Sequence, residues 1–108
     1  MGMGIEDLEW AAKLRLRFGD ARPTDAEWVA IKQKLPIGSE VSGRVVAAAA
    51  FGVWMDIGVQ FPALLEVPQL DDFWHDRYPP EGEMLAAKVL DFRESGRQVY
   101  LTQRFVPR

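Results

Sequence analysis

Residues 51–58 of this chain read FGVWMDIG, and this stretch decides the fold. The apolar residues Val53, Met55 and Ile57 recur at every second position, which predicts a β-strand with one buried face. The residues between them, among them Trp54, are expected to point outward. A strand of this kind needs hydrogen-bonded neighbours, so further strands are expected on both sides of it in the sequence.

The flanking sequence supplies those strands. Alternation predicts a strand over residues 40–46, with Val41, Gly43 and Val45 directed inward. Three more strand-like segments follow the quoted stretch, over residues 61–67, 83–92 and 98–102. The last two flank a polar turn, and a long irregular connection over residues 69–82 precedes them. Five strands with one long connection predict a mainly β fold, a five-stranded antiparallel barrel of the OB type.

Two short helices are expected before the barrel. Residues 7–18 carry an apolar stripe at helical spacing, formed by Leu8, Ala11, Ala12, Leu14 and Phe18. A second helix is expected to begin after Thr24, which forms a capping-box pattern with Glu27, and to stop at Pro36. Its residues Trp28 and Ile31 are expected to pack on the barrel or on the first helix. The chain therefore divides into a helical extension over residues 1–35 and a barrel domain over residues 36–108.

Length and composition narrow the class of protein. A chain of 108 residues has the size of one domain. The absence of cysteine excludes disulfides and thiolate metal sites. The longest apolar stretch, residues 45–55, is too short to span a membrane, and the N-terminus lacks the pattern of a signal peptide. A cytoplasmic protein without membrane association, metal or cofactor is expected.

The charge distribution limits how the chain could bind nucleic acid. The formal net charge is -3. Residues 36–108 hold seven basic and ten acidic side chains, so the predicted barrel carries the whole deficit. Because phosphate neutralisation dominates nucleic-acid affinity, any binding of RNA would have to be local and assisted by aromatic rings.

Five fragments, in this order and at this spacing, resemble the S1 RNA-binding domain family. They read IGSEVSGRVV, FGVWMDIG, ALLEV, GEMLAAKVLD and VYLT, at residues 37–46, 51–58, 63–67, 82–91 and 99–102. The resemblance covers roughly residues 35–104. It implies an OB-type barrel that binds RNA on one face. The residues used would be two aromatics of the second strand, a histidine of the third, and an aspartate and an arginine near the last hairpin.

The two aromatic positions of the family fall on Phe51 and Trp54. An exposed ring offers a base a stacking surface worth about 1–3 kcal/mol. Gly52 is expected to let the strand bulge, so that both rings can face outward. The alternative is that one of the two rings packs under the N-terminal helices.

The remaining family positions match only in part. The histidine position falls on Glu66, whose carboxylate would repel phosphate and suggests a weakened or redirected site. The aspartate falls on Asp91, which could equally serve the hairpin structurally. The arginine corresponds to Arg97 or to its neighbour Gln98. A small positive patch is completed by other basic residues, namely Arg44, Lys88 and Arg93.

Enzymatic function has little support in the sequence. His75 is the single histidine, and no cysteine or suitably placed serine could form a nucleophile and base pair with it. We expect His75 to serve loop packing, and the protein not to be an enzyme.

Two functions of different classes remain, and the sequence favours the first. One is a single-stranded RNA-binding module that stacks bases on the barrel face. The other is a protein-interaction adaptor that has weakened or lost RNA binding and uses the loop residues Phe73, Trp74 and Tyr78 as anchors. That loop could instead fold back and plug one end of the barrel. A binder of small molecules or oligosaccharides would follow from analogy with other OB barrels alone.

Overall fold

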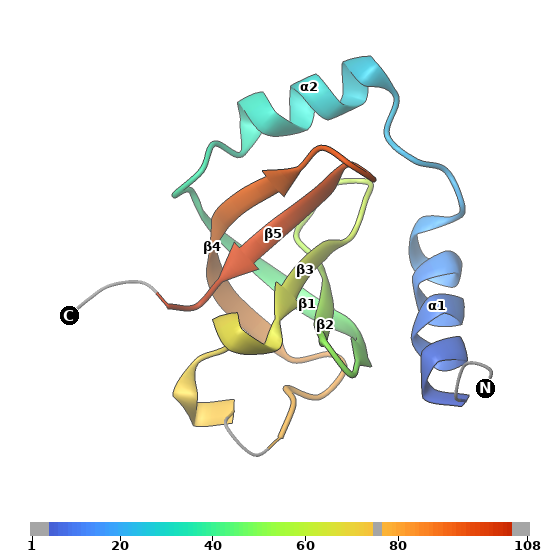
Figure 1. Ribbon diagram of the computed structural model, residues 1–108, viewed down its shortest axis with the longest axis vertical. Helices are drawn as coiled ribbons and strands as arrows, with labels where there is room; N and C mark the ends of the chain where they lie inside the picture. Colours follow the sequence, from blue (N-terminus) through green and yellow to red (C-terminus); the bar gives the residue numbers. More distant parts are fainter. Residues whose placement is uncertain (1–4, 75–76, 105–108) are drawn as a thin grey trace.

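The computed structural model describes residues 5–74 and 77–104. Helices α1 (Ile5–Phe18) and α2 (Asp25–Lys34) come first. Five strands follow, with bounds β1 Glu40–Ala49, β2 Gly52–Asp56, β3 Ala63–Glu66, β4 Met84–Arg93 and β5 Gln98–Thr102. Two short 3-10 helices, η1 (Val67–Gln69) and η2 (Asp72–Trp74), lie between β3 and β4. The molecule is therefore a mainly β protein in which two helices precede the strands along the chain, as predicted (Figure 1).

The strands close into a barrel in the order β1-β2-β3-β5-β4. Four of the five pairings are antiparallel, but β3 and β5 run parallel. The predicted antiparallel barrel is corrected in this one respect. The long connection after β3 carries the chain across the barrel before β4 begins, so that β5 returns in the same direction as β3.

Strands β1 and β3 differ most from those expected. β1 continues to Ala49 instead of ending at residue 46, and the extension pairs with β2. β3 stops at Glu66 because Val67 and Pro68 already belong to η1, where proline suits the first turn of a helix. The hairpin of β4 and β5 lies where the sequence predicts it.

Alternation along the strands builds the core as predicted. Val45, Val53, Met55, Leu65 and Leu101 are almost completely buried inside the barrel. Together with the closed strand order, this packing leaves the alternate residues of each strand on the outer surface.

Helix α2 closes one end of the barrel (Figure 1). Thr24 caps it, and the reciprocal hydrogen bonds of the predicted capping box with Glu27 are both present. Trp28 and Ile31 are buried in the barrel core, which confirms that they dock there. The indole N–H of Trp28 donates to a carboxylate oxygen of Glu94 in the β4–β5 turn at 2.7 Å.

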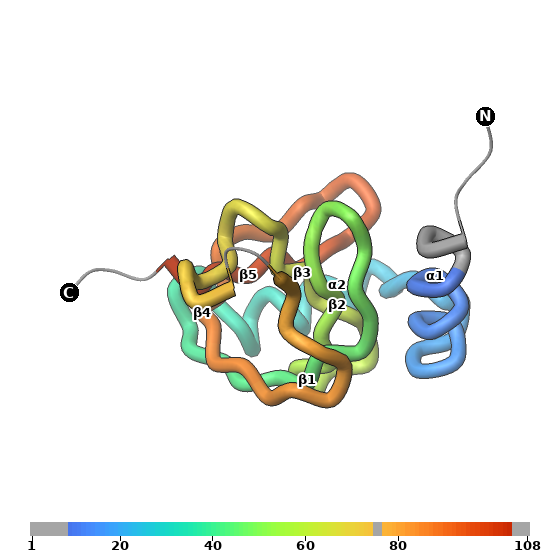
Figure 2. The backbone as a smooth tube through the Cα atoms, turned by 90° about the horizontal axis from the view of Figure 1, so that it is seen from below, coloured from blue at the N-terminus to red at the C-terminus, as the bar shows by residue number. Residues whose placement is uncertain are grey.

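Helix α1 lies beside the barrel, not across its end (Figure 2). It packs against β1. Its last turn leads into Gly19, which adopts a positive φ of 79° and starts the extended segment that reaches α2. No helix in the described part of the chain is both long and apolar enough to cross a membrane.

Candidate functional site

Four side chains form one row across the outer surface of the barrel. Trp54 of β2 pairs with Leu64 of β3, Leu64 pairs with Tyr100 of β5, and Tyr100 pairs with Asp91 of β4. Residues directly opposite each other on neighbouring strands point to the same side of the sheet. We call these four residues the outer row. It connects two positions that the sequence analysis singled out, Trp54 and Asp91.

A cluster of three aromatic rings covers the β2 end of the outer row. The ring of Trp10, from α1, stacks on Trp54 with the centroids 5.5 Å apart and 23° between the planes. Phe51 meets both tryptophans edge to face, at 5.5 Å from Trp10 and 6.1 Å from Trp54. Offset stacked and edge-to-face contacts of this kind are the favourable geometries for aromatic pairs.

The cluster corrects the expectation that both predicted rings are free. Phe51 is 42% exposed, but Trp54 is only 9% exposed because α1 lies on it. Trp54 points outward from the barrel as predicted. Its ring nevertheless packs under an N-terminal helix, which is the alternative given above for one of the two rings. Phe51 keeps an accessible face.

Gly52 does not produce the expected bulge. Residues 52–54 of β2 stay in regular register with β1, and the irregularity lies on β1 between Val45 and Ala47. Glycine is needed at position 52 for a different reason. A Cβ atom there would lie 2.4 Å from the carbonyl oxygen of Leu65 on β3. Gly52 thus lets β2 and β3 approach closely.

In the part of the chain that the structure describes, small residues and two ion pairs help to hold helix α1 on the barrel. Ala47 and Ala49 of β1 are buried without belonging to the barrel core, and their small side chains let the helix approach. The ion pairs join Lys13 to Glu81 and Arg17 to Asp56. The hydrogen bond from Lys13 to Glu81 raises the pKa of the lysine above its usual value.

Two polar groups are left unsatisfied where α1 meets the barrel. Among the described residues, the indole N–H groups of Trp10 and Trp54 are buried without a hydrogen-bond partner. Burying such a donor unpaired costs about 1–3 kcal/mol. The contact between α1 and the barrel therefore gains from ring stacking and loses part of that gain to desolvation.

Arg97 and Gln98 lie next to the aromatic cluster. Both line a cleft of about 280 Å³ between α1 and the barrel, to which Trp10 and Trp54 also contribute. The Arg97 guanidinium donates to the carbonyl of Pro23 at 2.8 Å and forms an ion pair with Asp25. Arg97 lies in the hairpin turn with a φ of 55°, and these two contacts join its side chain to the start of α2 and the segment before it.

Gln98 is the second of the two candidates for the family arginine. Its amide donates to the carbonyl of Pro62 at 2.8 Å and sits half-buried in the same cleft. The structure thus brings Trp54, Arg97 and Gln98 together, and it assigns the arginine position to neither residue alone.

The other three predicted site residues lie apart from this cleft. Glu66 is half-buried opposite Gly52, one strand away from the aromatic cluster. Asp91 is exposed, and its carboxylate accepts the backbone N–H of Phe92 at 2.8 Å. Arg44 donates to the carbonyl of Gly82 at 2.9 Å and pairs with Asp56 in register, on the side where α1 is anchored.

Solved structures with the same architecture confirm the fold. GSP13 from Bacillus subtilis is 18% identical, with a TM-score of 0.54 over 68% of this chain and 62% of its own. Mycoplasma genitalium RNase R, in complex with ribose methylated single-stranded RNA, is 20% identical, with a TM-score of 0.57 over 69% of this chain and 14% of its own. A chain of the a/eIF2alpha-aDim2p-rRNA complex from Pyrococcus horikoshii is 18% identical, with a TM-score of 0.53 over 61% of this chain and 42% of its own. The barrel is an S1-like OB fold.

The likeness is one of fold. No protein-family model matches the sequence. The chain spans less than two thirds of the length of each of these three proteins. The S1-like barrel is therefore the shared unit, and the residues on its surface must indicate its use.

Tyr100 is a surface residue of the S1-like barrel that sequence analysis did not select. Its half-buried ring lies in the outer row between Leu64 and Asp91, and the guanidinium of Arg93 sits over it at 4.3 Å from the centroid. The alternation of residues in β5 could have identified Tyr100, because Val99 and Leu101 face inward and Tyr100 therefore points outward.

Trp10 was also missed. It lies four residues before Leu14 and eight before Phe18, so helical spacing places all three on one face. All three line the cleft beside Trp54. The spacing was thus a usable signal for the residue that covers the predicted stacking site.

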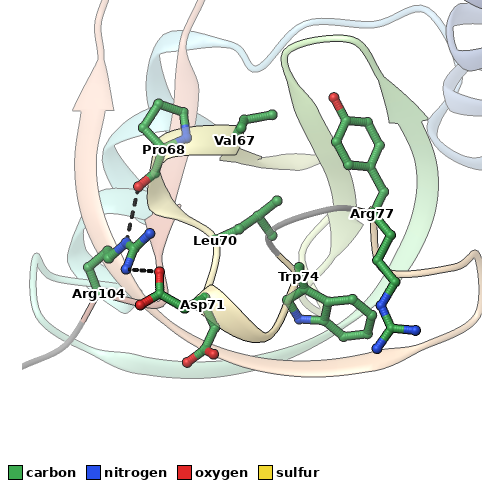
Figure 3. A pocket seen from close by; sticks show the side chains of 9 residues that line it. Val67, Pro68, Leu70, Asp71, Trp74, Arg77 and Arg104 are labelled. Carbon is green, nitrogen blue, oxygen red and sulfur yellow. Dashed lines mark hydrogen bonds and ion pairs between the residues drawn. The ribbon is translucent and has the colours of Figure 1, made fainter.

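A second hollow, of about 480 Å³, lies under the connection between β3 and β4 (Figure 3). Its nine lining residues are Val67, Pro68, Leu70, Asp71, Asp72, Trp74, Arg77, Tyr78 and Arg104. Arg104 bridges it by donating to the carbonyl of Pro68 and pairing with Asp72. Arg77 lies over the rings of Phe73 and Trp74, at 4.8 and 5.2 Å from the centroids.

The three aromatic residues predicted as anchors in this connection differ in exposure. Trp74 and Tyr78 are partly buried and pack against the core, whereas Phe73 is 63% exposed. The loop therefore folds back on the barrel, and Phe73 remains at its surface. His75 lies outside the described residues. Within residues 5–74 and 77–104, no group of acidic or histidine side chains is arranged to hold a metal ion.

Proposed function

We propose that this chain is a single-stranded RNA-binding module that holds bases along the outer row of its S1-like barrel. The observation that carries the proposal is the strand pairing that places Trp54 and Tyr100 in the same row. Trp54 and Tyr100 are separated by one strand, so their backbones lie about 10 Å apart on the same side of the sheet, with the buried Leu64 between them. Two rings at this separation suit successive or near-successive bases of a single strand.

Each end of the row would contribute differently. At the β2 end, Phe51 and Trp54 would stack a base, and Arg97 and Gln98 would offer donors beside it. At the β4 end, Tyr100 with Arg93 would form a stacked platform that also carries a positive charge near the phosphates. Arg44 would act only as a peripheral charge.

The charges of the barrel favour modest affinity. With a net charge of -3 and Glu66 on the strand next to the aromatic cluster, few phosphates can be neutralised. Stacking would then supply most of the binding free energy, and the dependence of affinity on salt would be shallow for a nucleic-acid-binding protein.

The test is a fluorescence anisotropy titration with a short labelled oligoribonucleotide at about 50 mM salt, where electrostatic binding is strongest. Saturable binding is expected, and Trp54→Ala should weaken it about 5- to 150-fold, the effect of losing one stacked base. Phe73→Ala is the matched control, since it removes an exposed ring from the connection between β3 and β4. The absence of saturation at about 100 µM protein would contradict the proposal, because that is weaker than ordinary non-specific binding.

Exposure of Phe73 favours a second candidate function. This ring, with Arg77 stacked over it, would anchor a partner protein, as aromatic and arginine residues commonly do. Affinity capture before and after ribonuclease treatment separates the two functions. Partners that persist after RNA removal and disappear with Phe73→Ala would favour the adaptor.

A further inference from the structure

The aromatic face proposed for RNA is already occupied by the chain itself. Trp10 stacks on Trp54 at 5.5 Å and 23°, a geometry that a nucleobase would adopt on the same ring. Phe51 also contacts Trp10, in an edge-to-face geometry. A base and Trp10 cannot both lie on this surface of Trp54.

We propose that α1 is a displaceable cover of the RNA-binding face, with Trp10 standing in for a base, so that RNA and α1 compete for Trp54. This inference rests on the proposed function and specifies how the site is regulated. The chain would exchange between a closed form, with Trp10 on Trp54, and an open form that binds RNA.

The polar contacts that attach α1 to the barrel are weak enough for the helix to be displaced. The two ion pairs described between α1 and the rest of the chain, Lys13 with Glu81 and Arg17 with Asp56, join side chains that are largely solvent-exposed, Asp56 excepted. Exposed ion pairs contribute little and are screened by salt. The closed form also leaves the indole N–H groups of Trp10 and Trp54 buried without a described partner, a cost that opening removes.

The barrel does not depend on α1 for its core. Among the side chains whose burial the structure describes, those of the core come from α2, the strands and the β3–β4 connection, and none of the described side chains of α1 belongs to it. The segment from Gly19 to Thr24 links α1 to α2 without helix or strand structure, so α1 could swing away while α2 stays docked.

In competition of this kind, the apparent association constant equals that of the open form multiplied by the fraction of molecules that are open. A chain that is closed nine times in ten would bind RNA about tenfold more weakly than one that is always open. Trapping the closed form should therefore suppress binding, and removing Trp10 should strengthen it.

The decisive experiment locks α1 in place. The chain has no cysteine, so Lys13→Cys and Glu81→Cys can be introduced together, at positions whose native side chains touch. Bridging the two thiols with a short bismaleimide gives the closed form, and capping both with N-ethylmaleimide gives a matched open-competent control. The bridged chain should bind the labelled oligoribonucleotide at least tenfold more weakly than the capped chain. Equal affinities would overturn the inference.

A second variant checks the role of the ring itself. Trp10→Ala in the full chain should tighten RNA binding, whereas Leu16→Ala, at an 88% exposed position of the same helix, should leave it unchanged. Weaker binding by Trp10→Ala would overturn the inference, because Trp10 would then belong to the RNA site. If the capped, the bridged and the Trp10→Ala chains all fail to bind RNA, the proposed function itself fails. If all bind equally, only the cover is wrong.

Discussion

Trp54 and Tyr100 face the same side of the barrel because both are in register with Leu64, which lies on the strand between them. The two rings differ in their surroundings. Trp54 is covered by a ring from α1, and Tyr100 carries the guanidinium of Arg93. One face thus holds one blocked and one open stacking surface. This difference determines which variants should change RNA binding and in which direction.

Tyr100 should contribute to RNA binding through its ring. Tyr100→Ala is expected to weaken binding of a short oligoribonucleotide by about 1–3 kcal/mol, the usual contribution of one stacked base. Tyr100→Phe keeps the ring and should retain most of the affinity. Anisotropy titrations of both variants measure the difference. If the two variants bind equally, the ring of Tyr100 plays no part.

Glu66 should weaken the site by repelling phosphate. Glu66→Gln removes the charge at nearly constant shape and should raise affinity up to about fivefold at low salt, within the range of exposed charge interactions. The gain should shrink as salt increases, because screening shortens the range of the repulsion. Titrations at two salt concentrations provide the check, with Glu40→Gln at the start of β1 as the control. An unchanged affinity for Glu66→Gln would place the phosphates elsewhere.

Gly52 should be required for the pairing of β2 with β3. In Gly52→Ala the new methyl group would lie 2.4 Å from the carbonyl oxygen of Leu65, so one strand must shift and stability should fall clearly. Gly58→Ala is the comparison, since its Cβ meets nothing within 4 Å and only the positive φ of 92° is strained, at about 1–2 kcal/mol. Thermal unfolding should show the larger loss for Gly52→Ala. The reverse order would contradict the close approach of the two strands.

The contact of Glu94 with α2 should make stability depend on pH. Hydrogen bonds from Lys32 and then Trp28 lower the pKa of Glu94 below its ordinary value of 4.5. Because the folded chain favours the charged carboxylate, this contribution is present above pH 4.5 and is lost as the pH falls through the lower pKa of the folded state. The melting temperature of Glu94→Gln should lie below that of the parent at pH 7, and the difference should shrink in acid. A difference that grows on acidification would contradict the assignment.

Burial of Trp28 should matter more than this surface contact. Trp28 is 4% exposed and belongs to the barrel core, so Trp28→Ala should destabilise the chain by about 3–5 kcal/mol. Chemical denaturation measures the loss. A small effect would mean that α2 is not part of the core.

Short-range patterns explain most of what could be predicted. The alternation of Val53, Met55 and Ile57 placed the core face of β2 correctly, and the capping box placed the start of α2. These signals lie within a few residues of each other, and each reflects a local physical preference.

The features that could not be predicted depend on contacts between distant segments. Whether Trp54 is free or covered depends on where α1 docks, and its partner Trp10 lies 44 residues earlier in the chain. The need for Gly52 arises from the backbone of β3, and the direction of Arg97 from its link to Asp25. Alternation shows which way a side chain points from a strand, but it does not show what lies above it.

The central claim, that RNA binds along the outer row, is tested most directly by an NMR titration of the full chain with a short single-stranded oligoribonucleotide. The indole N–H signals of Trp54 and Trp10 and the backbone signals of residues 51–54, 64, 91–93 and 97–100 should shift together and saturate. The indole signal of Trp28, at the end of the barrel closed by α2, should stay in place. Shifts confined to the β3–β4 connection around Phe73, or an unchanged spectrum, would contradict the claim.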